Sequence, residues 1–294
     1  MKTGLSSYSL SRAISAGEMD ILTAIQWIAE NGGQHVEIVP VGFTLTDNDA
    51  LVKAVVAKAA AAGIAISSYT IGASFINKTD AEYEQEIERV KKEVDIAAAL
   101  GVKLMRHDAA SRPIPETTVE CFEADLPKVA AACRDIADYA GQYGITTSVE
   151  NHGYHFQGSE RVQHLVLAVG RDNFRTTVDT GNFLCADEDP LVAVKNNIKY
   201  ASMIHLKDFY RRAPEQNPGE GWFKSRAGYY LRGAIIGHGD INLPAILQII
   251  KDSGYDGFLS IEFEGMEDCR LGSRIGMQNT LRFLNELKEA RIYE

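Results

Sequence analysis

The sequence predicts a single-domain α/β protein, a (β/α)8 TIM barrel formed by residues 1–294. Short runs rich in β-branched and aromatic residues alternate along the chain with longer helical runs, several of which close on glycine. There are eight runs of each kind, and eight strands each followed by a helix close a barrel. No linker-like or low-complexity segment divides the chain, and large barrels reach this length as one domain.

The predicted strands are short apolar runs bounded by turn residues or by the end of a helical run. They lie at residues 3–10, 35–40, 64–70, 102–108, 145–151, 175–181, 201–208 and 258–264. A doubly wound open sheet would show the same alternation. No G-x-G-x-x-G segment follows the first strand, however, so a nucleotide-binding fold is poorly supported.

The predicted helices follow the strands in strict alternation. They lie at residues 18–33, 49–63, 81–101, 119–144, 159–170, 190–198, 243–254 and 270–290. Asp49, Ser159 and Asp189 are suitable N-caps, because a short side-chain oxygen can accept from the open amides of the first turn.

One connection, residues 209–240, is much longer than the others. It combines five arginine or lysine residues with six aromatic residues, which is unusual for a disordered segment. Loops of this length are commonly functional, so we predict a partial lid over the site, able to hold a phosphate or carboxylate on the substrate. A subunit-contact loop is the alternative.

The composition limits the classes of partner. A formal net charge of −10 argues against general binding to nucleic acid or to an anionic membrane. The first residues contain no apolar segment of signal-peptide length, and no stretch approaches a membrane span, so a cytoplasmic protein is expected. Four scattered cysteines form neither a disulfide framework nor a zinc knuckle.

The last four predicted strands each end in a residue that can bind a metal ion. These residues are Glu150, Asp179, His205 and Glu262. Strand side chains alternate between faces, and each of the four shares its face with mostly small or polar neighbours while the other face is largely aliphatic. All four are therefore expected to point into the barrel at its C-terminal rim, where barrel active sites lie.

Three converging carboxylates would repel one another, and a divalent cation would compensate their charge. Three carboxylates and one imidazole suit Mn²⁺, Mg²⁺, Co²⁺, Fe²⁺ or Zn²⁺, and the lack of thiolate ligands disfavours a purely structural zinc site. The sequence thus predicts one divalent metal ion as cofactor. Glu264 has the same strand parity as Glu262, which we prefer because it ends the apolar run.

The segments "SVEN", "VDTGN", "HLKD" and "GFLSIEFE", in this order at these strand ends, resemble the xylose isomerase-like TIM barrel superfamily. That superfamily includes sugar phosphate isomerases and epimerases, ketose 3-epimerases, inosose dehydratases and endonuclease IV-type enzymes. The resemblance implies that the four rim residues bind the metal, and that Glu150 and Glu262 also form a catalytic acid–base pair. It further implies that Arg211 contacts the substrate and a catalytic glutamate.

Other polar residues near the predicted rim are candidates for substrate binding. Asn182 stands where epimerases of the superfamily often carry a histidine, three positions after the metal aspartate, which is a departure from the ketose-epimerase pattern. The remaining candidates are Glu37, His107, His152, Lys207 and His238. For Glu37 a plain salt bridge is the alternative, and for His107 a polar rim residue.

A metal ion that binds a carbonyl and the neighbouring hydroxyl would acidify the adjacent C–H and stabilise an enediolate. Epimerisation, aldose–ketose isomerisation and dehydration can all follow. The leading hypothesis is a sugar isomerase or epimerase acting on a sugar, sugar phosphate or sugar acid, with an inosose-type dehydratase as the alternative. Endonuclease IV-like hydrolysis is disfavoured by the charge and by seven scattered histidines. A non-catalytic sugar-binding barrel stays open, and the outer helices would allow a homo-oligomer.

Overall fold

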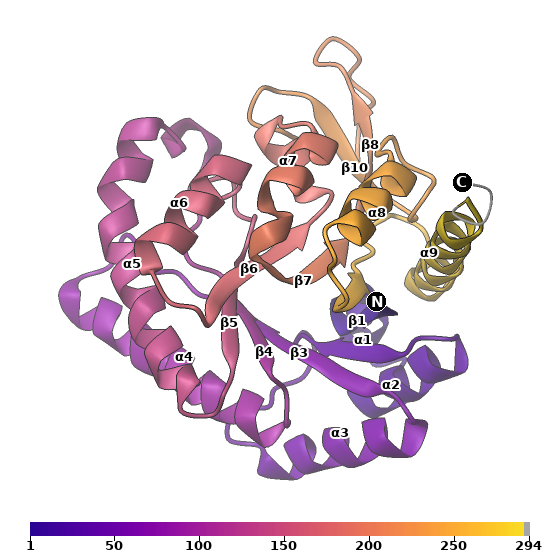
Figure 1. The fold of residues 1–294 in the computed structure, drawn as a ribbon, viewed down its shortest axis with the longest axis horizontal. Helices are drawn as coiled ribbons and strands as arrows, with labels where there is room; N and C mark the ends of the chain where they lie inside the picture. Colours follow the sequence, from indigo (N-terminus) through magenta and orange to yellow (C-terminus); the bar gives the residue numbers. More distant parts are fainter. Residues whose placement is uncertain (291–294) are drawn as a thin grey trace.

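The computed structural model describes residues 1–290 and contains a closed barrel of eight parallel strands (Figure 1). The strands are β1 (Lys2–Ser6), β2 (His35–Ile38), β3 (Ala65–Ile71), β4 (Leu104–His107), β5 (Thr146–Glu150), β6 (Phe174–Asp179), β7 (Ala201–Leu206) and β11 (Phe258–Ile261). They pair in this order, and β11 closes the ring on β1. The predicted barrel is confirmed. Residues 291–294, which the sequence assigns to the same domain, lie outside the described part.

Helices surround the strands (Figure 1). They are α2 (Ile21–Glu30), α3 (Asp49–Ala62), α4 (Asp80–Ala99), α5 (Val119–Gly141), α6 (Ser159–Val169), α7 (Pro190–Asn197), α8 (Leu243–Asp252) and α9 (Cys269–Ala290). Asp189 is the N-cap of α7, as expected. The N-cap of α3 is Asn48 and not Asp49, because the Asn48 side chain accepts from the Leu51 amide. Gly158, and not Ser159, precedes α6.

The first strand is shorter than predicted. It ends at Ser6 and continues as a 3₁₀ turn, η1 (Ser7–Leu10), and a short helix, α1 (Ser11–Ser15). The Ser6 hydroxyl accepts from the Tyr8 amide and so caps this turn. Local serine hydrogen bonds of this kind compete with the sheet ladder, which explains the early end.

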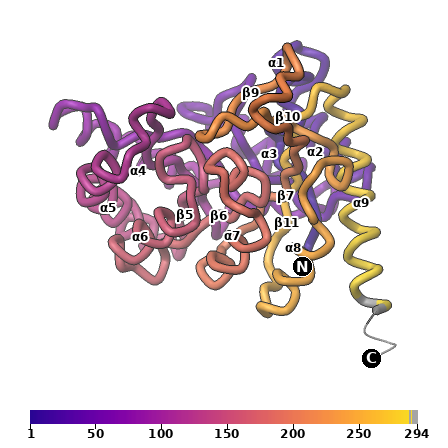
Figure 2. The backbone as a smooth tube through the Cα atoms, turned by 90° about the horizontal axis from the view of Figure 1, so that it is seen from above, coloured from indigo at the N-terminus to yellow at the C-terminus, as the bar shows by residue number. Residues whose placement is uncertain are grey.

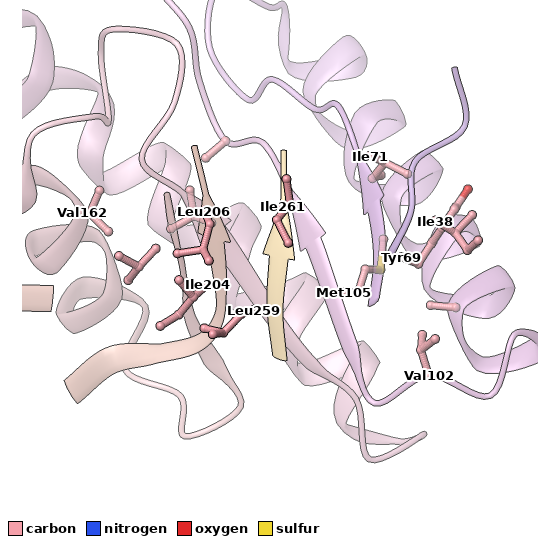
Figure 3. Packing of buried hydrophobic residues seen from close by; sticks show 14 of the residues in the cluster. Ile38, Tyr69, Ile71, Val102, Met105, Val162, Ile204, Leu206, Leu259 and Ile261 are labelled. Carbon is pink, nitrogen blue, oxygen red and sulfur yellow. The ribbon is translucent and has the colours of Figure 1, made fainter. Parts of the chain in front are cut away.

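The core lies between the barrel and its helices. Figure 3 shows Ile204 and Leu206 on β7 beside Leu259 and Ile261 on β11, and the strand register places Leu259 opposite Ile204 and Ile261 opposite Leu206. All four side chains are essentially inaccessible to solvent. Burying a side chain of this size contributes about 1.5–3 kcal/mol. The intervening strand positions therefore face the barrel axis.

The long connection after β7 is an ordered antiparallel sheet instead of an irregular loop. Its strands are β8 (Asp208–Arg212), β9 (Phe223–Lys224) and β10 (Tyr230–Ala234), in the order β8–β10–β9. Figure 2 shows β9 and β10 near one end of the molecule. The guanidinium groups of Arg212 and Arg232 each lie 5.6 Å from the Trp222 ring, within cation–π range.

Asp208 holds the turn that follows this sheet. Its carboxylate accepts from the backbone amides of Gly237 and Gly239, each at 2.9 Å. The last residue of the "HLKD" segment therefore fixes the backbone of the "GHGD" segment, residues 237–240. Within residues 1–290, no helix is both long enough and apolar enough to cross a membrane.

Candidate metal centre

The C-terminal ends of the last barrel strands bring Glu150, Asp179, His205 and Glu262 together. Their potential ligand atoms all lie within 4.8 Å of one another. Parallel pairing sets this arrangement, because Asp179 lies opposite His205 in the register of β6 and β7. Glu262 follows β11 directly, and its amide donates to the Leu206 carbonyl on β7. All four residues are buried, and Glu262, at 8 %, is the most exposed.

The centre lies above a layer of small hydroxyl side chains. Ser148 and Thr177 share a hydrogen bond of 2.8 Å across β5 and β6, two residues before Glu150 and Asp179 respectively. Because side chains alternate along a strand, these hydroxyls occupy the same inward face as the carboxylates. The alternation of side chains between the two strand faces, from which we predicted that the carboxylates point into the barrel, therefore holds on β5 and β6.

His205 lies in the middle of the group. Its Nδ1 atom is 3.4 Å from a Glu150 oxygen, 3.8 Å from a Glu262 oxygen and 3.9 Å from an Asp179 oxygen. His205 Nδ1 is buried without a hydrogen-bond partner, and the buried Asp179 Oδ2 accepts no hydrogen bond, although Lys207 Nζ lies 3.2 Å away. Buried polar atoms rarely lack partners. Three carboxylates and one imidazole with open ligand atoms fit a divalent cation.

Burial and charge shift the pKa values of these groups in different directions. Burial raises the pKa of Glu262 to about 7, against the lowering effect of Lys207. Burial would also raise the pKa of Glu150, but the nearby charges of Arg106 and His205 hold it well below its ordinary value. Burial raises the pKa of Asp179, although Lys207 opposes this. A divalent cation would favour the ionised form of all three carboxylates.

Two buried cations compensate part of the negative charge. Arg106 Nε lies 2.9 Å from Glu150, and its Nη2 lies 2.7 Å from Asp108. Lys207 Nζ lies 2.6 Å from Glu262 and 3.2 Å from Asp179. The ligand carboxylates thus have fixed ionic partners on two sides.

A cavity of about 180 Å³ opens over the centre. Its lining combines charged rim residues with a few apolar and hydroxyl side chains: Tyr8, Val39, Val41, Thr70, Arg106, Asp108, Glu150, His152, Lys207, Glu262 and Glu264. No described residue from 209 to 240 lines this cavity. The lid predicted from that segment is therefore not part of the cavity wall.

Four of the predicted substrate residues lie at or beside the centre. Lys207 and His152 line the cavity. Asn182 donates to Glu150 at 2.8 Å and accepts from Lys207 at 3.2 Å, so it joins a ligand to a cation. Glu37 lies beneath the centre, where its carboxylate contacts His205 and does not line the cavity.

Three other predicted substrate residues are placed elsewhere. His107 is fully buried on the opposite face of β4 from Arg106, with its ring edge-on to Phe75. Arg211 stacks 3.8 Å from the ring of Tyr229 and lines a different cavity, of about 700 Å³. His238 is exposed in the turn after β10. For Arg211 the reason is that β8 turns away from the barrel into an antiparallel sheet.

The structure also adds residues that were not among the sequence candidates. Tyr8 lines the cavity from the turn η1, and Thr70 lines it from the end of β3. Arg106 faces inward, because the strand register pairs it with Ser148, an inward residue of β5. Glu264 is partly exposed and contacts Lys207 at 3.4 Å, whereas Glu262 lies in the ligand group.

Fold and site together define a TIM barrel with a buried carboxylate–histidine group at its C-terminal rim. The chain belongs to the xylose isomerase-like TIM barrel family, whose sequence profile matches residues 25–287. The inosose dehydratase of Clostridium perfringens (strain 13 / Type A) is 23% identical over 149 residues, which cover 48% of this chain and 48% of that protein. The chain thus spans about half the length of the curated relatives it matches first.

Solved structures share the barrel over almost the whole chain. The zinc-bound IOLI protein superposes with a TM-score of 0.73 at 18% identity, covering 97% of each chain. D-psicose 3-epimerase, solved in the presence of D-fructose, gives a TM-score of 0.70 at 16% identity and covers 97% of this chain and 99% of its own. At these identities the likeness establishes the fold.

Proposed function

We propose that the chain is a divalent-metal-dependent isomerase or epimerase of a small sugar, acting by proton transfer next to a carbonyl. The observation that carries this proposal is the convergence of Glu150, Asp179, His205 and Glu262 within 4.8 Å at the barrel rim. The zinc-bound and epimerase structures with the same fold support it.

In this proposal the four converging residues hold the metal through three carboxylate oxygens and His205 Nδ1. The ion could be Mn²⁺, Mg²⁺, Co²⁺, Fe²⁺ or Zn²⁺, all of which accept such ligands. When bound, it would polarise a substrate carbonyl and lower the pKa of the neighbouring C–H. The remaining steps are carried out by protein side chains.

Glu150 and Glu262 are the proposed proton carriers. They come from β5 and from the end of β11, which β6 and β7 separate in the barrel, and both line the cavity. Two carboxylates flanking a substrate carbon can remove a proton from one face and return it to the other, which inverts the centre. If one carboxylate moves the proton between adjacent carbons, an aldose–ketose shift results.

Lys207 and His152 are the proposed substrate-positioning groups. Lys207 reaches the cavity from below the rim, held by Glu262, Glu264 and Asn182, so its ammonium has a fixed direction. His152 reaches the cavity edge, where its Nδ1 lies 3.1 Å from Asp108. Donors fixed in this way can hold the hydroxyl groups of a bound sugar without reorganisation.

The charge pairing at the cavity favours an unphosphorylated substrate. Each cation lining it already faces a carboxylate: Arg106 faces Glu150 and Asp108, while Lys207 faces Glu262. A phosphate brings two negative charges and typically requires unpaired arginine or lysine donors. A neutral polyhydroxy ketone is therefore the proposed substrate class.

A dehydratase is the second candidate, favoured by one specific observation. Several matched relatives are named inosose dehydratases, at 23–26% identity. Loss of a hydroxyl next to the carbanion centre would use the same metal site and the same initial proton removal. The two reactions therefore differ in the step that follows proton removal.

Product mass separates these reactions. Metal-loaded protein would be incubated in D₂O with ketohexoses and with inososes, and the products analysed by mass spectrometry. An isomerase or epimerase gives a product of unchanged mass apart from solvent deuterium at carbon, whereas a dehydratase gives a product lacking one water. A metal-loaded protein that binds these compounds without product or exchange would contradict both proposals. His205→Ala serves as the inactive control.

A further inference from the structure

A fourth carboxylate contacts His205, through the ring nitrogen that faces away from the proposed metal ligands. Glu37, at the C-terminal half of β2, has both carboxylate oxygens near His205 Nε2, at 2.9 and 3.0 Å. Both side chains are fully shielded from solvent. Because Glu37 does not line the cavity, a substrate in that cavity does not touch it.

Glu37 is itself held in a fixed orientation. Thr70 on β3 donates to one carboxylate oxygen at 2.6 Å, and Ser260 on β11 donates to the other at 3.1 Å. Together with His205 on β7, three separate strands fix this carboxylate. Its position therefore follows from the barrel itself and not from a mobile loop.

The direction of the hydrogen bond follows from the chemistry of the two groups. An ionised carboxylate only accepts hydrogen bonds, so Nε2 must carry the hydrogen that points at Glu37. A neutral imidazole has one ring hydrogen, which leaves the Nδ1 atom with a free lone pair. Nδ1 is the atom that lies 3.4–3.9 Å from the carboxylates of Glu150, Asp179 and Glu262.

We infer that Glu37 is a positioning residue, which fixes the tautomer and ring orientation of His205 so that Nδ1 can bind the metal. This inference rests on the proposed metal site. A carboxylate behind a ligating histidine is a common way to orient the ring, and its loss typically weakens metal binding by about 10–100-fold. Glu37 is thus assigned to the support of the centre and not to substrate recognition.

The test is Co²⁺ affinity, followed by visible absorption, for the wild type and three variants of Glu37. Glu37→Leu removes the acceptor and should weaken Co²⁺ binding by about 10–100-fold. Glu37→Gln keeps both reach and an acceptor oxygen and should retain most of the affinity. Glu37→Asp keeps the charge but loses reach, so it should resemble Glu37→Leu. A higher affinity in Glu37→Asp than in Glu37→Gln would overturn the inference, because only the local charge would then matter.

Glu93→Gln is the matched control. Glu93 is another buried carboxylate, hydrogen-bonded to Tyr69 at 2.6 Å and to Thr46 at 3.0 Å, and neither contact involves His205. Its substitution should lower the melting temperature and leave Co²⁺ affinity unchanged. If Glu93→Gln weakens Co²⁺ binding as much as Glu37→Leu, a general structural effect replaces the positioning role.

A metal-free measurement separates this inference from the proposed function. Although burial opposes it, the carboxylates of Glu37, Glu150 and Glu262 raise the pKa of His205 well above its ordinary value in the metal-free protein, so both ring nitrogens carry hydrogen at neutral pH. Imidazole ¹⁵N NMR of histidine-labelled protein, recorded as the pH is raised and with His205→Ala for assignment, reports which ring nitrogen keeps its hydrogen when the ring becomes neutral. His205 should carry it on Nε2 in the wild type and in Glu37→Gln, and lose this preference in Glu37→Leu or Glu37→Asp. A neutral His205 ring that keeps its hydrogen on Nδ1 in the wild type refutes the role of Glu37 directly. A wild type that binds no Co²⁺ but shows the Nε2 form refutes only the metal site.

Discussion

The buried Arg106, beside the four proposed metal ligands, offers a test of how the negative charge of Glu150 is compensated. Arg106 Nε lies 2.9 Å from Glu150, and its Nη2 lies 2.7 Å from Asp108. We predict that Arg106→Met destabilises the metal-free protein, because it removes the cation and leaves the Glu150 carboxylate buried without it. Glu150 is 2 % exposed, so water cannot replace the lost partner.

The expected size follows from the degree of burial. Removing one partner of a buried ion pair typically costs about 3–5 kcal/mol. Glu150 keeps the hydrogen bond from Asn182, and Asp108 is 24 % exposed and keeps its contact with His152, so the lower end, about 3 kcal/mol, applies. A bound divalent ion would compensate the charge of Glu150, so saturating metal should reduce the difference in the free energy of unfolding between Arg106→Met and the wild type.

Urea unfolding with EDTA and with excess metal measures both effects. Arg112→Met is the matched control, because Arg112 pairs with Asp125 through two contacts of 2.7 and 3.1 Å away from the ligand group. Its loss of stability should be the same in both conditions. The reasoning fails if Arg106→Met costs nothing without metal, or if its cost is unchanged by metal.

Two further predictions concern stability. Burial lowers the pKa of His107 to about 4, so at pH values between 4 and the ordinary histidine pKa the unfolded state binds more protons than the folded state. The free energy of unfolding should therefore fall by about 2 kcal/mol between pH 7 and pH 5. In His107→Gln the urea midpoint should depend correspondingly less on pH. Equal pH profiles would contradict this. Gly239→Ala should cost about 1–3 kcal/mol of stability, because the new Cβ would lie 2.1 Å from Asp208. Gly141→Ala is the control and should not lower the melting temperature, because Gly141 lies in α5 and its new Cβ would have an ordinary 3.5 Å contact with Asn173.

The barrel and the inward position of its rim residues could be predicted, because both depend on the local pattern of residues within each strand. Strand alternation indicated the barrel and correctly placed Ser148 and Glu150 on one inward face. It could not indicate the sheet formed by β8, β9 and β10, because those strands are short and rich in charged residues, and their pairing is with one another. The order of the strands around the barrel could be predicted, because eight consecutive βα units close a barrel in sequence order.

Long-range geometry explains what the sequence missed in the site. Glu37 and His205 are 168 residues apart, so nothing in the sequence indicates that they hydrogen-bond. The family resemblance implied that Arg211 reaches the substrate near His205, but the chain turns away at Asp208 and carries Arg211 to Tyr229. Parity within β4 separates Arg106 from His107, but only the register with β5 shows which of them faces inward.

The most direct test of the account is the metal content of the purified protein, measured for the wild type beside Glu150→Gln and His205→Ala. We expect about one divalent ion per chain in the wild type, because the four ligands form a single site, and loss or marked weakening of metal binding in both variants. A wild type that holds no metal tightly, even after incubation with Mn²⁺, Co²⁺ or Zn²⁺, would contradict it.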